Sequence, residues 1–130
     1  MEYFKDEIIE SIKEYEDSKY YYFSIKTNKQ TMNFGISTFQ VCCENYGINI
    51  LYDNKKIDLN AELCKELENK FMDKKILSVK WNEGKYGEDC IININIDNEF
   101  ISVELFNDHN GYYPHTYKVN WCDYTDEDEI

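Results

Sequence analysis

The chain has 130 residues, of which 42% are hydrophobic and 16% aromatic, which is enough for one packed core and too few for two domains. It carries 26 acidic residues against 14 basic ones, for a formal net charge of -12, and every basic residue is a lysine. Such a surface repels nucleic acid and anionic lipid, and it lacks the arginine side chain best suited to reading guanine or gripping phosphate. Composition therefore disfavours direct binding to DNA, RNA or a membrane, and it favours a basic protein as the partner.

The sequence also bears on the compartment. No stretch approaches the roughly 20 apolar residues of a membrane span, and residues 1–7 begin acidic, without the apolar segment of a signal peptide. We therefore expect one domain over residues 1–130, located in the cytoplasm. In that compartment the five cysteines are expected as thiols rather than disulfides.

The first predicted element is an amphipathic helix over residues 2–17. Phe4, Ile8, Ile12 and Tyr15 recur at three- and four-residue spacing, while acidic side chains occupy most of the remaining positions. This acidic helix, taken as residues 1–18, is the first candidate for a charged binding surface.

The rest of the chain indicates strands and a second helix. Short runs of β-branched and aromatic residues predict strands over 19–27, 31–39, 76–82, 90–96, 100–106 and 116–121, with a further apolar run at 48–52 and a turn at 97–99. A helix is predicted from an N-cap at Asn60 to Met72, because Leu63, Leu67 and Phe71 form a stripe beside Cys64. The acidic tail, residues 123–130, is expected to fray. The predicted fold class is α+β, a mostly antiparallel sheet of about five to seven strands with an N-terminal amphipathic helix and one internal helix.

Both histidines lie beside the Asn110-Gly111 pair of a predicted hairpin, and a Cys-Cys pair lies in the first third of the chain. Cysteine and histidine are the ligands that zinc prefers, so the candidate metal ligands are Cys42, Cys43, His109 and His115. Their spacing matches no common zinc motif. Alternatively, Cys64, Cys90 and Cys122 are small buried side chains and His109 caps the turn. We find no nucleophile elbow, Walker loop or dinucleotide fingerprint, so we predict no catalytic residue and no enzyme.

Two short motifs carry a resemblance. Cys42-Cys43-Glu44, together with the segment from His109 to Tyr113 (His-Asn-Gly-Tyr-Tyr), resembles a family of uncharacterised small phage and bacterial domains. In that family a Cys-Cys segment precedes a strand and a (His/Ser)-Asn-Gly-Tyr-Tyr motif ends a hairpin. This chain has Pro114-His115 where the family often has Gly-Gly. The resemblance implies a fold and a motif, and no activity.

In overall type the chain resembles phage-encoded anti-CRISPR inhibitors, which are small, acidic and cytosolic. The resemblance implies an inhibitor of a nucleic-acid-handling defence protein, with a Cas9-type effector as the leading partner, whose basic channel would accept carboxylates in place of phosphates. Glu7, Glu10, Glu14 and Asp17 of the first helix would supply charge together with the acidic tail, and Tyr112 and Tyr113 would anchor the contact. The alternative is a zinc-binding domain with a structural Cys/His site and no inhibitory role. Oligomeric state cannot be predicted from the sequence.

Overall fold

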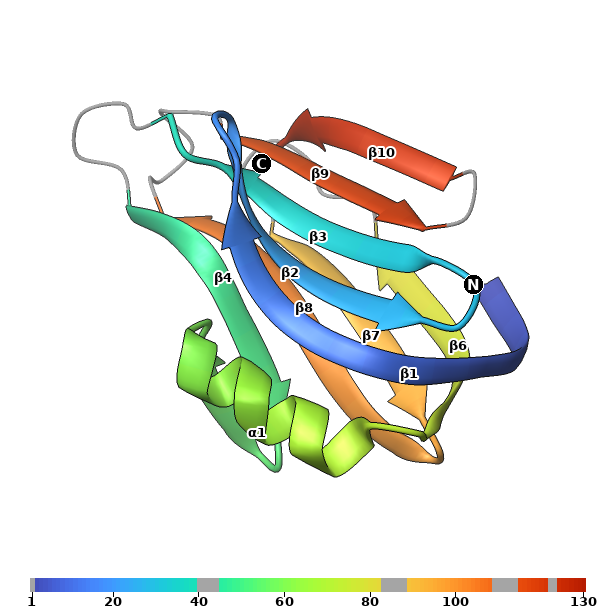
Figure 1. The fold of residues 1–130 in the computed structure, drawn as a ribbon. Coiled ribbons are helices and arrows are strands. Elements are labelled where there is room, and N and C mark those ends of the chain that lie inside the picture. Colours follow the sequence, from blue (N-terminus) through green and yellow to red (C-terminus); the bar gives the residue numbers. More distant parts are fainter. Residues whose placement is uncertain (1, 40–44, 83–88, 109–114, 122–123) are drawn as a thin grey trace.

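The structure is a computed structural model that describes residues 2–39, 45–82, 89–108, 115–121 and 124–130 (Figure 1). These residues form ten strands and one helix, whose bounds are β1 (Glu2–Glu16), β2 (Tyr20–Thr27), β3 (Thr31–Ser37), β4 (Asn45–Tyr52), β5 (Lys55–Asp58), α1 (Ala61–Phe71), β6 (Lys75–Asn82), β7 (Cys90–Ile96), β8 (Glu99–Asp108), β9 (Thr116–Trp121) and β10 (Tyr124–Glu129). The strands form one sheet in the order β10-β9-β3-β2-β1-β6-β7-β8-β4-β5. All neighbouring pairs are antiparallel.

Strand β1 belongs to two halves of this sheet, because residues 9–16 pair with β2 whereas residues 2–8 pair with β6. We call β10, β9, β3, β2 and residues 9–16 of β1 the front layer, and the remaining strands the back layer (Figure 1). Apolar side chains of both layers form one core. The rings of Trp81 on β6 and Trp121 on β9 meet edge to face there, with centroids 4.6 Å apart. The fold is therefore a β-sandwich made by folding a single sheet on itself.

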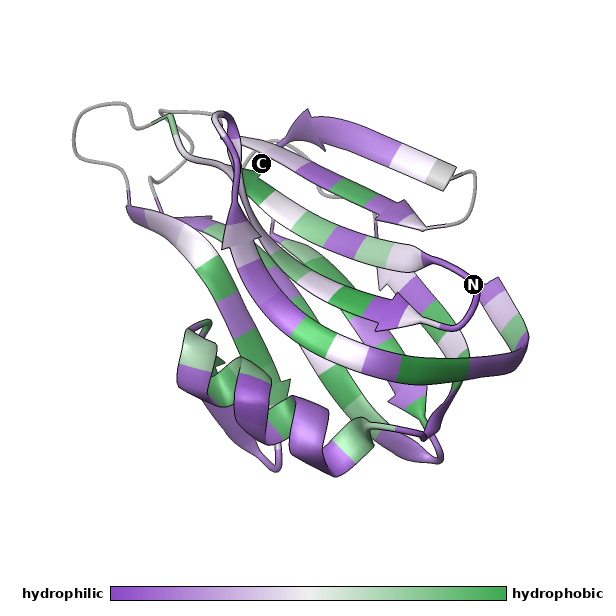
Figure 2. Ribbon diagram, viewed as in Figure 1, coloured by the Kyte–Doolittle hydropathy of each residue, from purple (hydrophilic) through white to green (hydrophobic). Residues whose placement is uncertain are grey.

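Period-two burial in the strands supports the strand predictions, and Figure 2 shows the same alternation as hydropathy. On β7, Cys90, Ile92, Ile94 and Ile96 are buried, and the residues between them are half-buried. The predicted turn follows as a two-residue hairpin, because Asp97 and Asn98 have positive φ angles of 49° and 69° and Ile96 pairs with Glu99.

Helix α1 confirms the second predicted helix. Asn60 caps it by accepting a hydrogen bond from the backbone N–H of Leu63 at 2.8 Å, and Leu63, Cys64, Leu67 and Phe71 are buried. The carboxylate of Glu68 accepts a hydrogen bond from the backbone N–H of Ile12 at 2.9 Å. Residues 9–16 of β1 no longer pair with β6, so one edge of that segment has no strand beside it. Helix α1 covers this edge, which would otherwise expose its backbone groups.

The predicted N-terminal helix is wrong, and with it the α+β class of five to seven strands. Residues 2–16 form the long strand β1, and the fold is nearly all antiparallel sheet. A register shift between Ile9 and Ser11 makes Glu10 an extra, bulged residue. Because of this bulge, Ile9 and Ile12 both face the core although they are three residues apart, a spacing otherwise typical of a helix. Tyr15, which the helix would have buried, is 44% exposed.

Two further strands were not predicted. The short β5 pairs with β4, and the acidic tail expected to fray forms β10. Residue Ile130 is 1% exposed, and its backbone N–H and C=O each form a 2.9 Å hydrogen bond with His115. In the described part of the chain no helix is long and apolar enough to cross a membrane.

Candidate functional site

The candidate site is the acidic strand β10, the outermost strand of the front layer (Figure 1). Four consecutive residues, Asp126 to Glu129, are acidic and pair with β9 from Val119 back to Thr116. Aspartate and glutamate disfavour strands, so intrinsic propensity does not explain this element. The ladder to β9 and the buried Ile130 hold it in place.

The four carboxylates alternate between the two sides of the strand. Asp126 lies on the core side, where the hydroxyl of Tyr117 donates to its Oδ2 at 2.7 Å. Glu127 lies on the outer side, where the hydroxyl of Tyr20 donates to its Oε2 at 2.8 Å. Two tyrosine hydroxyls thus orient two of the four carboxylates.

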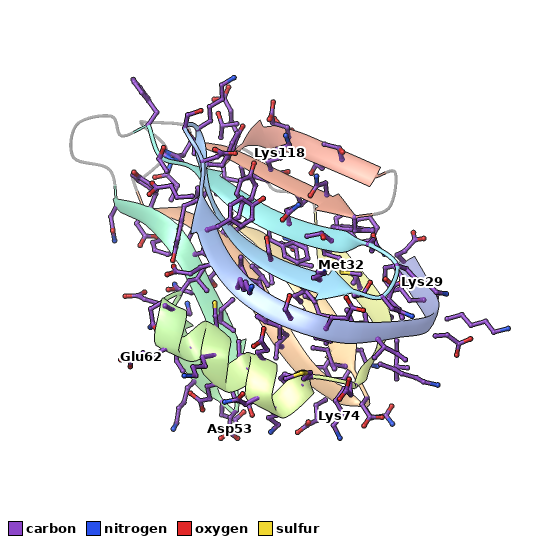
Figure 3. All side chains as sticks on the ribbon, viewed as in Figure 1. Lys29, Met32, Asp53, Glu62, Lys74 and Lys118 are labelled. Atoms are coloured by element: carbon purple, nitrogen blue, oxygen red, sulfur yellow. The ribbon has the colours of Figure 1, made fainter. Side chains whose placement is uncertain are left out.

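Among the described residues, no lysine forms an ion pair with this strand. The five ion pairs among the described residues join lysines to acidic residues elsewhere, and none of them involves β10. The nearest lysine in the pairing register is Lys118, opposite Glu127 (Figure 3). Its Nζ lies 5.9 Å from the ring centroid of Tyr20. The charge of β10 is therefore available to a partner.

A row of side chains on the outer face of the front layer leads to β10. The pairing register places Tyr15, Tyr22, Gly35, Lys118 and Glu127 opposite one another on successive strands. The rings of Tyr15 and Tyr22 stack with centroids 4.8 Å apart. Burial, and then the nearby charge of Asp17, raises the pKa of Tyr22 to about 12. Burial and the hydrogen bond to Glu127 also raise the pKa of Tyr20, so both phenols stay neutral at physiological pH.

The structure separates the four acidic residues that the sequence placed on one helix face. Glu7 is 4% exposed and accepts hydrogen bonds from Thr27 Oγ1 and, at 3.1 Å, from Gln30 Nε2. Glu10 is exposed and lies 3.9 Å from the ammonium group of Lys26.

The other two members of that set stabilise local structure. Glu14 accepts a hydrogen bond from the hydroxyl of Tyr21. Asp17 accepts hydrogen bonds from the backbone N–H groups of Lys19 and Tyr20 at 2.8 and 2.7 Å, and these bonds hold the pKa of its carboxyl below the usual value. The four residues do not form one binding face.

Of the four candidate metal ligands, Cys42, Cys43 and His109 lie outside the described residues, as do Tyr112 and Tyr113. His115 is buried; its ring stacks on Tyr46 with centroids 4.0 Å apart, and its Nε2 contacts the carbonyl oxygen of Ser37. A carbonyl only accepts, so Nε2 carries the proton and donates. No group of three or more potential metal ligands occurs among the residues that the structure describes.

The two cysteines that can be assessed are consistent with a structural role. Cys64 and Cys90 are buried, and the thiol of Cys90 donates to the carbonyl oxygen of Asn82 at 3.6 Å. Burial, and then the charges of Glu14 and Glu68, raises the pKa of the Cys64 thiol to about 12, so it is a thiol and a poor nucleophile at neutral pH.

A cleft of about 480 Å³ opens between the layers where β3 ends and β4 begins. Its walls include three aromatic rings (Tyr21, Tyr46 and Phe106) and two carboxylates (Glu16 and Asp58). Aromatic rings next to carboxylates favour cationic groups over anionic ones. The cleft therefore has the same preference for positive charge as β10.

Comparison with protein-family models, with curated proteins and with solved structures finds no match for this chain. The site therefore has to be judged from its own chemistry. Sequence reasoning placed the charged binding surface on a first helix and on an acidic tail expected to fray, and it missed that this tail is the ordered strand β10. A signal was present, because Tyr124 and Thr125 favour a strand and Ile130 is an apolar residue after four acidic ones.

Proposed function

We propose that this chain is a non-enzymatic protein-binding domain that docks on a lysine- and arginine-rich surface of a nucleic-acid-handling protein and keeps nucleic acid away from it. A Cas9-type effector is the partner suggested by the resemblance to anti-CRISPR inhibitors, and the cytoplasm of the host is where the two would meet. One observation carries the proposal. Four consecutive carboxylates stand on the outermost strand of the front layer without an ion pair among the described residues.

The geometry of an extended strand supports this proposal. An antiparallel strand rises by roughly 3.4 Å per residue, so Asp126 to Glu129 present about one negative charge every 3.4 Å. One strand of duplex DNA carries one phosphate for about the same rise. Because the carboxylates alternate between the two sides of the strand, the outer pair Glu127 and Glu129 are roughly 7 Å apart, and it is the charge per length of edge that resembles a phosphate backbone. The net charge of -12 would steer the encounter with a channel that neutralises phosphates.

The test neutralises β10 without changing its shape. In the combined variant Asp126→Asn, Glu127→Gln, Asp128→Asn and Glu129→Gln, the amide oxygens still accept from Tyr117 and Tyr20. A matched control removes four exposed charges elsewhere, through Asp53→Asn, Glu62→Gln, Glu66→Gln and Asp73→Asn. The control positions lie away from β10. Figure 3 places Asp53, Glu62 and the neighbour of Asp73, Lys74, in the region of α1, and it places Lys118 beside β10.

Binding to a purified Cas9-type effector is measured by biolayer interferometry between about 50 and 300 mM salt. We expect the β10 variant to lose at least about tenfold in association rate and to show a shallower salt dependence than the control variant. An excess of duplex DNA should compete with the wild-type chain for the effector. Equal losses in both variants would show that β10 has no special role. No binding to this effector or to other basic nucleic-acid-binding proteins would refute the proposal.

A further inference from the structure

The outer edge of β10 exposes backbone hydrogen-bonding groups in a pattern that can be derived from one pair of residues. His115 and Ile130 exchange both backbone hydrogen bonds at 2.9 Å. In an antiparallel ladder such pairs alternate with pairs that form no backbone bonds to each other. Continuing the register from Ile130, the residues Asp128 and Asp126 bond to β9, whereas Glu129, Glu127 and Thr125 direct their N–H and C=O groups away from it. The outward N–H of Glu129 donates to Oδ1 of Asp128 at 2.9 Å, so Glu129 offers its C=O to a further strand.

These alternate positions form a docking edge, to which Thr125 and Glu127 contribute both backbone groups and Glu129 its C=O. Thr125 to Glu129 span roughly 14 Å at the rise of an antiparallel strand. All three outward-bonding residues are exposed or half-buried. A strand added to this edge would place its side chains opposite Glu127 and Glu129 on the outer face, and opposite Asp126 and Asp128 on the core side.

We propose that β10 receives a lysine- or arginine-rich extended segment of the partner protein as an eleventh strand, an inference that rests on the proposed function and specifies how its site binds. Cross-strand pairs of opposite charge stabilise a sheet, and like charges directly opposite destabilise it. The backbone groups supply hydrogen bonds that any strand can make, and the carboxylates restrict the choice to basic strands.

The two sheet edges of a second copy fit this position poorly. Two β10 strands would place four acidic residues opposite four acidic residues. The opposite edge of the sheet, β5, has only four residues, one of which is Asp58, and Lys56 on it already forms a 3.2 Å ion pair with Glu104. The acidic edge therefore resists self-pairing while it remains open to a basic strand.

The experiment uses the full chain and three synthetic peptides of equal charge. The first is a nine-residue peptide of alternating lysine and valine with blocked ends. The second carries N-methyl groups on its lysines, and the third carries them on its valines. An extended strand turns the amides of every second residue toward the edge with which it pairs. We therefore expect the peptide methylated on those amides to bind at least about tenfold more weakly. The other methylated peptide should bind as tightly as the unmodified one.

Amide hydrogen exchange gives a second readout on the protein. With the unmodified peptide at saturation, we expect exchange at Thr125 and Glu127 to slow at least about tenfold, and exchange at Asp126 and Asp128 to change little.

The other outcomes separate this inference from the proposed function. Equal binding of all three peptides without protection of β10 would overturn strand addition and leave a purely electrostatic contact. Strand addition is likewise overturned if no peptide binds but the effector still binds in a β10-dependent way. Protection of these amides by raising the protein concentration alone would assign the edge to a second copy and overturn the inference. Failure of both the peptides and basic proteins to bind would overturn the inference and the proposed function together.

Discussion

Gly35 on β3 lies directly opposite Tyr22 on β2, and the tyrosine ring occupies the space that a side chain at position 35 would need. A β-carbon built on Gly35 would lie 2.4 Å from Cδ1 of Tyr22. The ring cannot easily turn away, because it stacks on Tyr15 and packs beside Tyr20, with centroids 4.8 and 5.7 Å away. Because position 35 has no side chain, the ring of Tyr22 can lie over β3 while it stacks on Tyr15.

We therefore expect Gly35→Ala to lower the free energy of unfolding by about 1–3 kcal/mol through overpacking. Urea denaturation followed by tryptophan fluorescence measures the change. Gly47→Ala is the matched control, because a β-carbon there would lie 3.2 Å from the ring of Phe106, a milder contact. Adding Tyr22→Ala should remove most of the extra cost of Gly35→Ala, as a double-mutant cycle would reveal. Additive losses would show that the two positions do not interact.

Glu7 and Glu10 lie three residues apart but should differ sharply on substitution. Glu7→Ala removes the acceptor of Thr27 Oγ1 and Gln30 Nε2 in a buried position, so we expect a loss of about 1–3 kcal/mol in the free energy of unfolding. Glu10→Ala removes an exposed ion pair whose charged atoms lie 3.9 Å apart. It should therefore change the free energy of unfolding by less than about 0.5 kcal/mol. Thermal and urea denaturation of the two variants checks this. Equal, small effects would argue against the burial of Glu7 in β1.

The elements that could be predicted from the sequence are those whose signals are local. The N-cap at Asn60 and the stripe from Leu63 to Phe71 specify α1 within a dozen residues. The Asp97-Asn98 turn between two alternating runs specifies the β7–β8 hairpin in the same way. For β1 the local pattern misled, because the bulge at Glu10 gives a strand a three-residue spacing of buried side chains.

Strand β10 has only a weak local signal, in Tyr124, Thr125 and Ile130, because most of its stabilisation is tertiary. Its acidic residues oppose a strand locally, and the hydrogen bonds of Ile130 with His115 join residues fifteen positions apart. Composition alone indicates that the chain is strongly negative and has no arginine. It could not locate that charge, since the location depends on which strand lies at the edge of the sheet.

The buried tyrosine Tyr22 should make the fold sensitive to alkali. Its pKa is raised to about 12 in the folded chain against an ordinary value of 10.0, so the folded state keeps a proton that the unfolded state loses. The stabilisation is therefore complete below pH 10 and is lost as pH rises from 10 through 12. Over that range Tyr22 should lower the free energy of unfolding by up to about 1.4 kcal/mol per pH unit.

Urea denaturation at pH 9, 10 and 11 measures this slope, and Tyr22→Phe should make it shallower. The control Tyr3→Phe changes a tyrosine that is 76% exposed and should leave the slope unchanged. An identical slope in wild type and Tyr22→Phe would contradict the burial of this phenol.

His115 should be required for stability and independent of metal. Its ring is 3% exposed, stacks on Tyr46 and donates to the carbonyl of Ser37, which ties β3, β4 and the start of β9 together. We expect His115→Ala to lower the free energy of unfolding by about 2–4 kcal/mol. His115→Phe keeps a ring to stack and loses the hydrogen bond, so it should cost less, about 1–2 kcal/mol. Denaturation midpoints of wild type with and without EDTA provide the decisive comparison. If EDTA alone lowers the wild-type midpoint as far as His115→Ala does, and elemental analysis finds stoichiometric zinc, His115 serves a zinc site and this account of its role is wrong.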